Sequence, residues 1–190
     1  AMVSPFLPDG NAAAYLAANP EASTLGLLVG AAYGLEYLHT RRPPITHGDL
    51  RGANILVSPA GEACLADFGL SKIMEAASGD SAHGTTTANA GATRWMAPEL
   101  FNGEPSEYPP SSYGMTIYEL MTGKVPFSRI KTSAMVIFAI SRGERPSKPV
   151  NTRHDWMPEL FDLMQACWNT QPSSRPTMSS VSERMRSIRE

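Results

Sequence analysis

Asp49, Asn54 and Asp67 have the residue types and the spacing to act together on a phosphate group. The first two lie in the run His47-Gly48-Asp49-Leu50-Arg51-Gly52-Ala53-Asn54, and the third begins the run Asp67-Phe68-Gly69 after a short interval. One carboxylate in such a trio can accept a proton, and the remaining oxygens suit a hard cation such as Mg²⁺. The trio therefore predicts phosphoryl-transfer chemistry.

Each of these residues also has a purely structural interpretation. Asp49 and Asn54 could cap turns, as aspartate and asparagine often do, and Asp67-Phe68-Gly69 taken alone is a common turn sequence. Glu99 and Arg175, two charges further along the chain, would be solvated by default. The choice between the two interpretations depends on the elements around the trio and on the motifs that follow it.

Short strands and turns are expected around the trio. Ile45-Thr46 is a brief extended piece before the first polar loop. The apolar runs Ile55–Val57 and Ala63–Leu65 flank Ser58-Pro59-Ala60-Gly61-Glu62, a turn-forming sequence, and so predict a β-hairpin. The trio is thus spread over a loop, a short hairpin and a second loop.

Helical patterns dominate the rest of the chain. Apolar residues recur at three- and four-residue steps from Leu25 to Leu38, which predicts an amphipathic helix capped by Ser23 or Thr24. Residues Ser71 to Thr93 are small and polar and predict a long loop. The expected fold is mainly α, and α+β overall. The other predicted helices are Asn11–Ala18, Ser112–Thr122, Thr132–Ser141, Pro158–Trp168 and Met178–Ile188.

Composition and charge argue against several classes of partner. The 190 residues suit one domain or one large lobe, and a net charge of -2 gives no electrostatic case for nucleic acid or an anionic membrane. The run from Leu25 to Leu38 is too short to span a bilayer. Cys64 and Cys167 have no metal-ligand spacing and are expected to be reduced. Reduced cysteines fit a cytoplasmic setting, and no nucleic-acid or membrane partner is expected.

Three motifs, taken in order, resemble those of protein kinases. The run from His47 to Asn54 is similar to the catalytic loop, Asp67-Phe68-Gly69 to the metal-binding loop, and Ala97-Pro98-Glu99 to the end of the activation segment. Two later runs, Tyr118 to Phe127 and Trp168 to Pro176, agree with this order. Five motifs in one order leave chance a negligible explanation. The local sequences Arg51-Gly52-Ala53-Asn54 and Trp95-Met96-Ala97-Pro98-Glu99 are similar to tyrosine-kinase-like serine/threonine kinases, particularly those of fungi.

The resemblance covers one lobe of a kinase. It implies that residues 1–190 form the large, C-terminal lobe, with a hinge remnant at 1–10 and an activation segment at 67–99. The Gly-rich phosphate loop, the strand lysine that pairs with the ATP phosphates and its helix glutamate are not in the sequence. The N-terminal lobe is therefore expected to be absent, and a small lobe or a partner is needed to complete the ATP site.

The resemblance implies a role for each polar residue of the site. Asp49 would accept or orient the proton of the attacking hydroxyl, and Arg51 would lie near the transferred phosphate, where a permanent positive charge stabilises the transition state. Asn54 and Asp67 would bind Mg²⁺, and Leu56 would contact the adenine ring of ATP.

The resemblance implies structural roles for further residues. His47 and Phe68 would pack in the lobe's interior, and Gly69 would let the loop turn after Asp67. Glu99 and Arg175 would form an ion pair that holds the activation segment.

The sequence departs from the kinase pattern at three positions. Gly48 stands where an arginine usually binds a phosphorylated activation loop, which predicts little dependence on such a phosphate. Ala92 replaces a threonine that would bond the catalytic aspartate, with Thr93 as the neighbouring candidate. Pro109 replaces the aspartate that holds the catalytic-loop backbone, and its helix is expected to begin near Ser111 because proline is tolerated only in a helix's first turn.

Two hypotheses from different classes follow. The first is an ATP-dependent protein serine/threonine kinase domain, truncated to its large lobe, that acts on protein substrates. The second is a catalytically inactive, pseudokinase-like module that binds or scaffolds partners. The intact trio of Asp49, Asn54 and Asp67 favours the first, whereas Pro109 and the missing phosphate-holding residues favour the second.

Overall fold

A computed structural model describes residues 5–67, 72–73, 92–102, 110–148 and 158–189 of the chain. Within these residues the fold is mainly helical, with two small sheets. Its α-helices are α1 (Ala12–Ala18), α2 (Thr24–His39), α3 (Pro110–Thr122), α4 (Ser133–Ser141), α5 (Pro158–Cys167) and α6 (Met178–Arg189). Its strands are β1 (Ile45–Thr46), β2 (Ile55–Val57), β3 (Ala63–Leu65) and β4 (Lys72–Ile73), and its 3₁₀ turns are η1 (Gly52–Asn54), η3 (Thr93–Trp95), η4 (Pro98–Asn102) and η5 (Pro172–Ser174).

Polar side chains cap the first two helices. The Asn11 side chain accepts the Ala14 N–H at 3.0 Å, and the Ser23 hydroxyl accepts the Gly26 N–H at the same distance, so each satisfies a donor that the first helical turn leaves free. Ser23 is thus the cap of α2, one of the two residues predicted for this role. The six predicted helices are confirmed to within two residues at each end.

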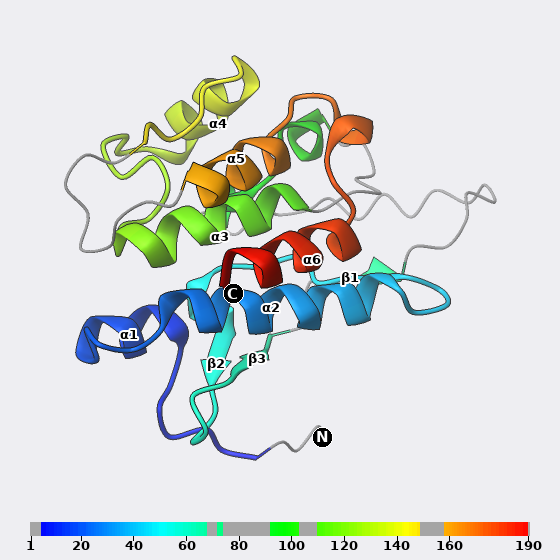
Figure 1. The fold of residues 1–190 in the computed structure, drawn as a ribbon. Helices are drawn as coiled ribbons and strands as arrows, with labels where there is room; N and C mark the ends of the chain where they lie inside the picture. The colour runs from blue at the N-terminus through cyan, green and yellow to red at the C-terminus, as the bar shows by residue number, and fades with distance from the viewer. Residues whose placement is uncertain (1–4, 68–71, 74–91, 103–109, 149–157, 190) are drawn as a thin grey trace.

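Helix α2 packs against α6 in the lower half of the molecule, and α3 packs against α5 above them (Figure 1). The buried apolar residues of these four helices form one continuous core. Tyr113 of α3 is fully buried, and its hydroxyl donates to the Leu28 carbonyl of α2 at 2.8 Å. The Ser182 hydroxyl of α6 donates to the Glu36 carboxylate of α2. These polar contacts, together with the apolar packing of the core, therefore fix the positions of the helices relative to one another.

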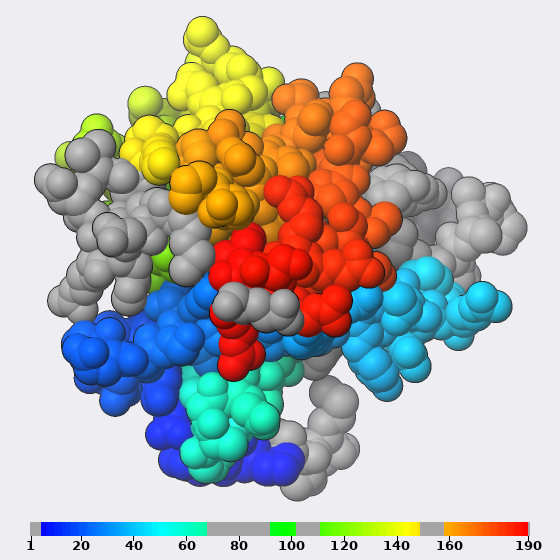
Figure 2. Space-filling view, viewed as in Figure 1, coloured from blue at the N-terminus to red at the C-terminus, as the bar shows by residue number. Residues whose placement is uncertain are grey.

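The predicted hairpin is present and projects from the helical body. β2 and β3 pair antiparallel with Ile55 opposite Leu65, and Gly61 makes the turn with a φ of 77°. The hairpin lies beside the chain's first described residues (Figure 2), because the Val57 N–H donates to the Gly10 carbonyl at 2.9 Å.

One strand was not predicted. Residues 71–93 were expected to be a loop, but Lys72 and Ile73 form β4 and pair antiparallel with β1. A strand of two residues has too few positions to show alternation, so its pairing depends on a partner distant in sequence. The rest of that predicted loop up to residue 91, apart from Lys72 and Ile73, lies outside the described residues.

The Glu99–Arg175 ion pair is confirmed. Arg175 donates two parallel hydrogen bonds to the Glu99 carboxylate, at 2.5 and 2.8 Å, and both side chains are buried. The Nε–H of Arg175 donates to the Asn169 carbonyl at 2.8 Å. This pair ties η4 to the segment that leads into α6.

Removing the cation of this pair should destabilise the chain strongly. We expect Arg175→Met to lower the free energy of unfolding by about 3–5 kcal/mol, because Glu99 would keep a buried charge without its counter-ion. Urea unfolding followed by circular dichroism measures the change. The exposed Arg186→Met in α6 is the matched control and should change stability by less than about 0.5 kcal/mol. Equal effects of the two variants would contradict this prediction.

A second stability prediction concerns His39, the last residue of α2. Burial lowers the pKa of His39 from 6.5 to about 4, and its Nε2 atom has no hydrogen-bond partner among the described residues. The folded chain therefore binds fewer protons than the unfolded chain between these pH values, so stability is lost as the pH falls from 6.5 towards 4.

We expect His39→Gln to reduce this pH dependence, measured as the urea midpoint at pH 7.5 and pH 5. Part of the pH dependence of the urea midpoint should remain in the variant, because burial also lowers the pKa of His47. An unchanged slope in the variant would contradict the assignment to His39.

Candidate active site

The predicted catalytic residues lie on the connection between β1 and β2. Asp49 and Asn54 are both buried, and Asn54 is the last residue of η1. The Asn54 Nδ2 donates to the Asp49 carbonyl at 2.7 Å and to the Asp49 Oδ2 at 3.0 Å. These two bonds fix the Asp49 carboxylate and leave the Asn54 Oδ1 as the oxygen that could bind a cation.

The two carboxylate oxygens of Asp49 differ. Oδ2 accepts from Asn54 and lies 3.4 Å from the Arg51 guanidinium. Oδ1 is buried and has no hydrogen-bond partner among the described residues. An unsatisfied buried acceptor is costly and calls for a donor. A hydroxyl group placed at Oδ1 would supply one.

Asp67 is held close to this loop by the end of the hairpin. The Ala66 N–H donates to the Asn54 carbonyl at 2.9 Å. Because Ala66 directly precedes Asp67, this bond holds Asp67 near Asn54, the other predicted cation ligand. Asp67 has a φ of 60°, a left-handed conformation that aspartate tolerates better than most residues. Its side chain is exposed. The structure thus brings the two predicted cation ligands onto adjacent backbone segments.

His47 is buried beneath the site, as predicted. Its Nδ1 accepts the Asp49 N–H at 3.4 Å. Burial lowers the pKa of His47, and this effect exceeds the opposing ones of a hydrogen bond with the Ala66 backbone and of the charges on Asp49 and Asp67. A neutral imidazole therefore supports the backbone on both sides of the site.

Arg51 lies on the partly exposed side of the loop. Its side chain is 27% exposed, against 7% for Asp49. The guanidinium lies 6.0 Å from the centre of the Trp95 ring, within the range of a cation–π contact. The Arg51 side chain is thus partly open to solvent, so a phosphate group could reach its guanidinium.

Sequence reasoning missed Glu119 of α3. This residue is 7% exposed, and its Oε2 accepts both the Gly52 N–H at 2.8 Å and the Trp95 indole N–H at 3.0 Å. Burial raises the pKa of Glu119, whereas the two hydrogen bonds and the Arg51 charge lower it by less. The available signal was a carboxylate placed one helical turn after the apolar Met115, on a face that is otherwise buried.

The remaining predicted residues are placed as follows. Leu56 is the middle residue of β2 and is half-buried. Gly48 has a φ of 85°. Thr93 is buried, and within the described ranges no hydrogen bond joins it to Asp49. Phe68, Gly69 and Pro109 lie outside the described residues.

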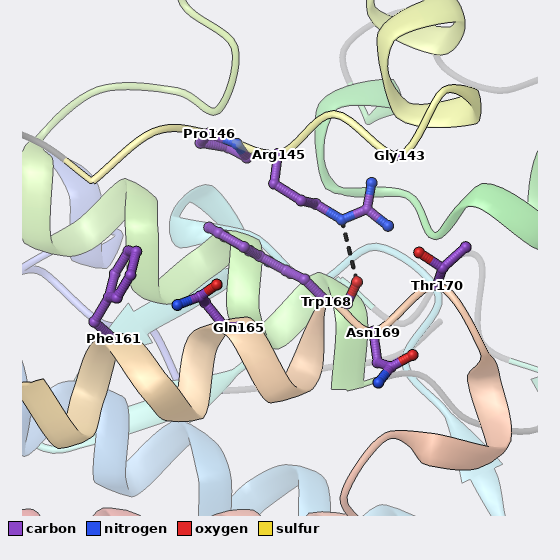
Figure 3. Close-up of a pocket in the computed structure, with 8 residues that line it drawn as sticks. All are labelled: Gly143, Arg145, Pro146, Phe161, Gln165, Trp168, Asn169 and Thr170. Carbon is purple, nitrogen blue, oxygen red and sulfur yellow. Dashed lines mark hydrogen bonds between the residues drawn. The ribbon is translucent and has the colours of Figure 1, made fainter.

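A small pocket of about 320 Å³ lies away from this site, between α5 and the segment that follows α4 (Figure 3). None of the residues predicted to be catalytic lines it. The Arg145 guanidinium at its edge donates to the carbonyls of Trp168, Ile140 and Glu144. This arginine therefore holds backbone together.

Comparison with known proteins decides which family the site belongs to. The sequence profile of the family described as protein tyrosine and serine/threonine kinase matches residues 1–185. The chain belongs to the protein kinase family.

Relatives of this kinase chain are named as serine/threonine kinases. It is 31% identical to the serine/threonine-protein kinase STY46 of Arabidopsis thaliana over 98% of the chain and 32% of that protein. It is 34% identical to TNNI3K of Mus musculus over 84% of the chain and 18% of that protein, and 29% identical to CTR1 of Arabidopsis thaliana over 88% and 20%. The chain thus spans at most about a third of each of these relatives. These names support a protein serine/threonine kinase domain over an inactive binding module.

None of the described helices is long and apolar enough to cross a membrane. No group of three or more His, Cys, Asp and Glu side chains that could hold a metal was found in the part of the chain that the structure describes.

Proposed function

We propose that this kinase chain carries the proton-accepting and cation-binding half of an ATP-dependent serine/threonine phosphorylation site. The observation that supports this best is the buried Oδ1 of Asp49, which has no partner within the described residues, while Oδ2 is fixed by Asn54 and Arg51. The substrate is a protein serine or threonine hydroxyl.

Asp49 receives the proton of that hydroxyl at Oδ1. Because Asn54 and Arg51 engage Oδ2, the carboxylate is held in one orientation before substrate binds. A positioned general base of this kind contributes about 10²–10⁴-fold to the rate. His47 supports the loop by accepting the Asp49 N–H at Nδ1.

Arg51 stabilises the negative charge that develops on the transferred phosphoryl group. Its guanidinium is permanently charged and partly exposed, so it can reach a phosphate oxygen while it stays close to Asp49. The ion pair between Arg51 and Asp49 also limits the like-charge repulsion between Asp49 and an incoming phosphate.

The residues present fit Mg²⁺ and ATP. Asn54 and Asp67 offer two hard oxygen ligands on adjacent segments, and Leu56 offers an apolar surface for the adenine ring. When bound, ATP would provide the phosphoryl group, and Mg²⁺ held by Asn54 and Asp67 would offset its negative charge. A small lobe or a partner supplies the remaining phosphate contacts, since the sequence has no Gly-rich phosphate loop.

Asp49→Asn tests the proposal. Assayed on a protein substrate after addition of a protein kinase small lobe, the variant should lose about 10²–10⁴-fold in kcat, because asparagine cannot accept the proton. The exposed Asp162→Asn in α5 is the matched control and should retain full activity. If phosphorylation in this assay does not depend on Asp49, the kinase proposal fails and the inactive binding module takes its place.

A thermal-shift measurement tests the expected half-site. We expect Mg-ATP at millimolar concentration to raise the Tm of the 190-residue chain by less than about 1 °C, because stabilisation depends on the ratio of ligand concentration to Kd and half of the ligand contacts are missing. Asp67→Asn should abolish any small shift. A large, saturable stabilisation that persists in Asp67→Asn would contradict the proposed placement of the cation.

A further inference from the structure

Glu119 joins the two functional segments of the site through a single oxygen. The Oε2 of this α3 residue accepts the backbone N–H of Gly52 in the catalytic loop and the indole N–H of Trp95 at the end of the activation segment. Hydrogen bonds to an ionised acceptor are about twice as strong as bonds between neutral groups. Both segments are thus held against α3 by one carboxylate.

The catalytic loop approaches Glu119 closely at Gly52. A Cβ at Gly52 would lie 3.1 Å from the Glu119 carboxylate and 2.8 Å from the Cδ2 atom of Leu120. A side chain at this position would therefore displace the ends of these two side chains. Glycine avoids that displacement and so favours the close approach of its N–H to the carboxylate.

The second contact between α3 and the catalytic loop is weaker. The Thr116 hydroxyl lies 3.4 Å from the Leu50 carbonyl, but it donates at 2.8 Å to the Ser112 carbonyl within its own helix. A hydroxyl has one proton, so the longer contact is the lesser of the two. Glu119 is accordingly the stronger hydrogen-bonding tie from α3 to this loop.

The tie reaches Asp49 through Arg51. Arg51 directly precedes Gly52, and its guanidinium lies over the ring of Trp95 and 3.4 Å from the Asp49 Oδ2. The Glu119 carboxylate therefore fixes both the backbone next to Arg51 and the Trp95 ring over which the Arg51 guanidinium lies. A shift of either would move the guanidinium relative to Asp49.

We propose that Glu119 is a positioning residue for phosphoryl transfer: by holding the Gly52 amide and the Trp95 ring, it fixes Arg51 beside Oδ2 of Asp49 and keeps Oδ1 for the substrate hydroxyl. The inference rests on the proposed function for the reaction and for the role of Asp49 Oδ1, whereas the contacts of Glu119 do not depend on it. The sequence provides a reason for such a device, because a proline, which has no carboxylate, stands at position 109, where the resemblance to kinases leads us to expect the aspartate that holds this loop.

Hydrogen exchange on the chain as it stands tests the tie itself. In Glu119→Ala, exchange of the Gly52 amide and of the Trp95 indole N–H should accelerate by at least about 10-fold, whereas the Val57 amide, bonded to the Gly10 carbonyl, should be unaffected. Glu119→Gln keeps an acceptor oxygen and should restore most of the protection. Unchanged exchange at both groups in a folded variant would overturn the proposal, and so would equal acceleration at all three.

Kinetics with an added small lobe test the positioning role. Glu119→Ala should lower kcat by about 10–100-fold and leave KM for ATP within about 2-fold, because a displaced Arg51 affects the transition state more than nucleotide binding. Glu119→Gln should recover part of the loss, and the exposed Glu183→Gln in α6 should cause none. Wild-type kcat in Glu119→Ala would overturn the inference.

Two further results keep the test decisive. If Glu119→Ala fails to fold, Trp95→Phe replaces it, since this variant removes the indole N–H donor and keeps an aromatic ring. Trp95→Phe should leave the Gly52 amide protected and lower kcat by less than Glu119→Gln does. A fall in kcat equal to that of Asp49→Asn would overturn the proposal. If Asp49→Asn has no effect but the exchange pattern holds, the proposed function fails while the tie from Glu119 stands.

Discussion

The burial of α3 is the constraint on which the rest of the structure depends. Tyr113, Thr116 and Ile117 of this helix are fully buried, and its neighbours include α1, α2, α5 and both 3₁₀ turns that border the site. A helix covered on so many sides has no freedom to rotate or slide without opening cavities in a close-packed core. The two 3₁₀ turns that contact α3 are therefore held in fixed positions by this helix.

Electrostatics in the site depends on one arginine shared by several carboxylates. Asp49 and Glu119 are both buried, Asp67 lies close by, and Arg51 is the cation that interacts with the first two. Among these four residues three carboxyl groups accompany one guanidinium, which favours the arrival of a cation before or with a phosphate. Burial lowers the pKa of His47 even though the negative charges of Asp49 and Asp67 oppose this effect.

Sequence reasoning succeeded where the determinant is local or lies within a motif. The periodicity of α2, its Ser23 cap and the β2–β3 hairpin follow from neighbouring residues, and the Glu99–Arg175 pair follows from the order of the motifs. It failed at β4 and at Glu119, whose partners lie far away in sequence: β4 pairs with β1, and Glu119 bonds Gly52, 67 residues before it. Contacts of this kind depend on how helices pack, which a pattern along one chain does not specify.

Gly48 gives the catalytic loop a relaxed backbone. At a φ of 85° a residue with a side chain would store about 1–2 kcal/mol of steric strain, and a strained turn needs an external group to keep it from unwinding. Glycine adopts this conformation without that cost. The turn at Gly48 is therefore held without stored strain, so the hydrogen bonds from the Gly52 N–H to Glu119 and from the Asn54 side chain to the Asp49 carbonyl do not have to offset any.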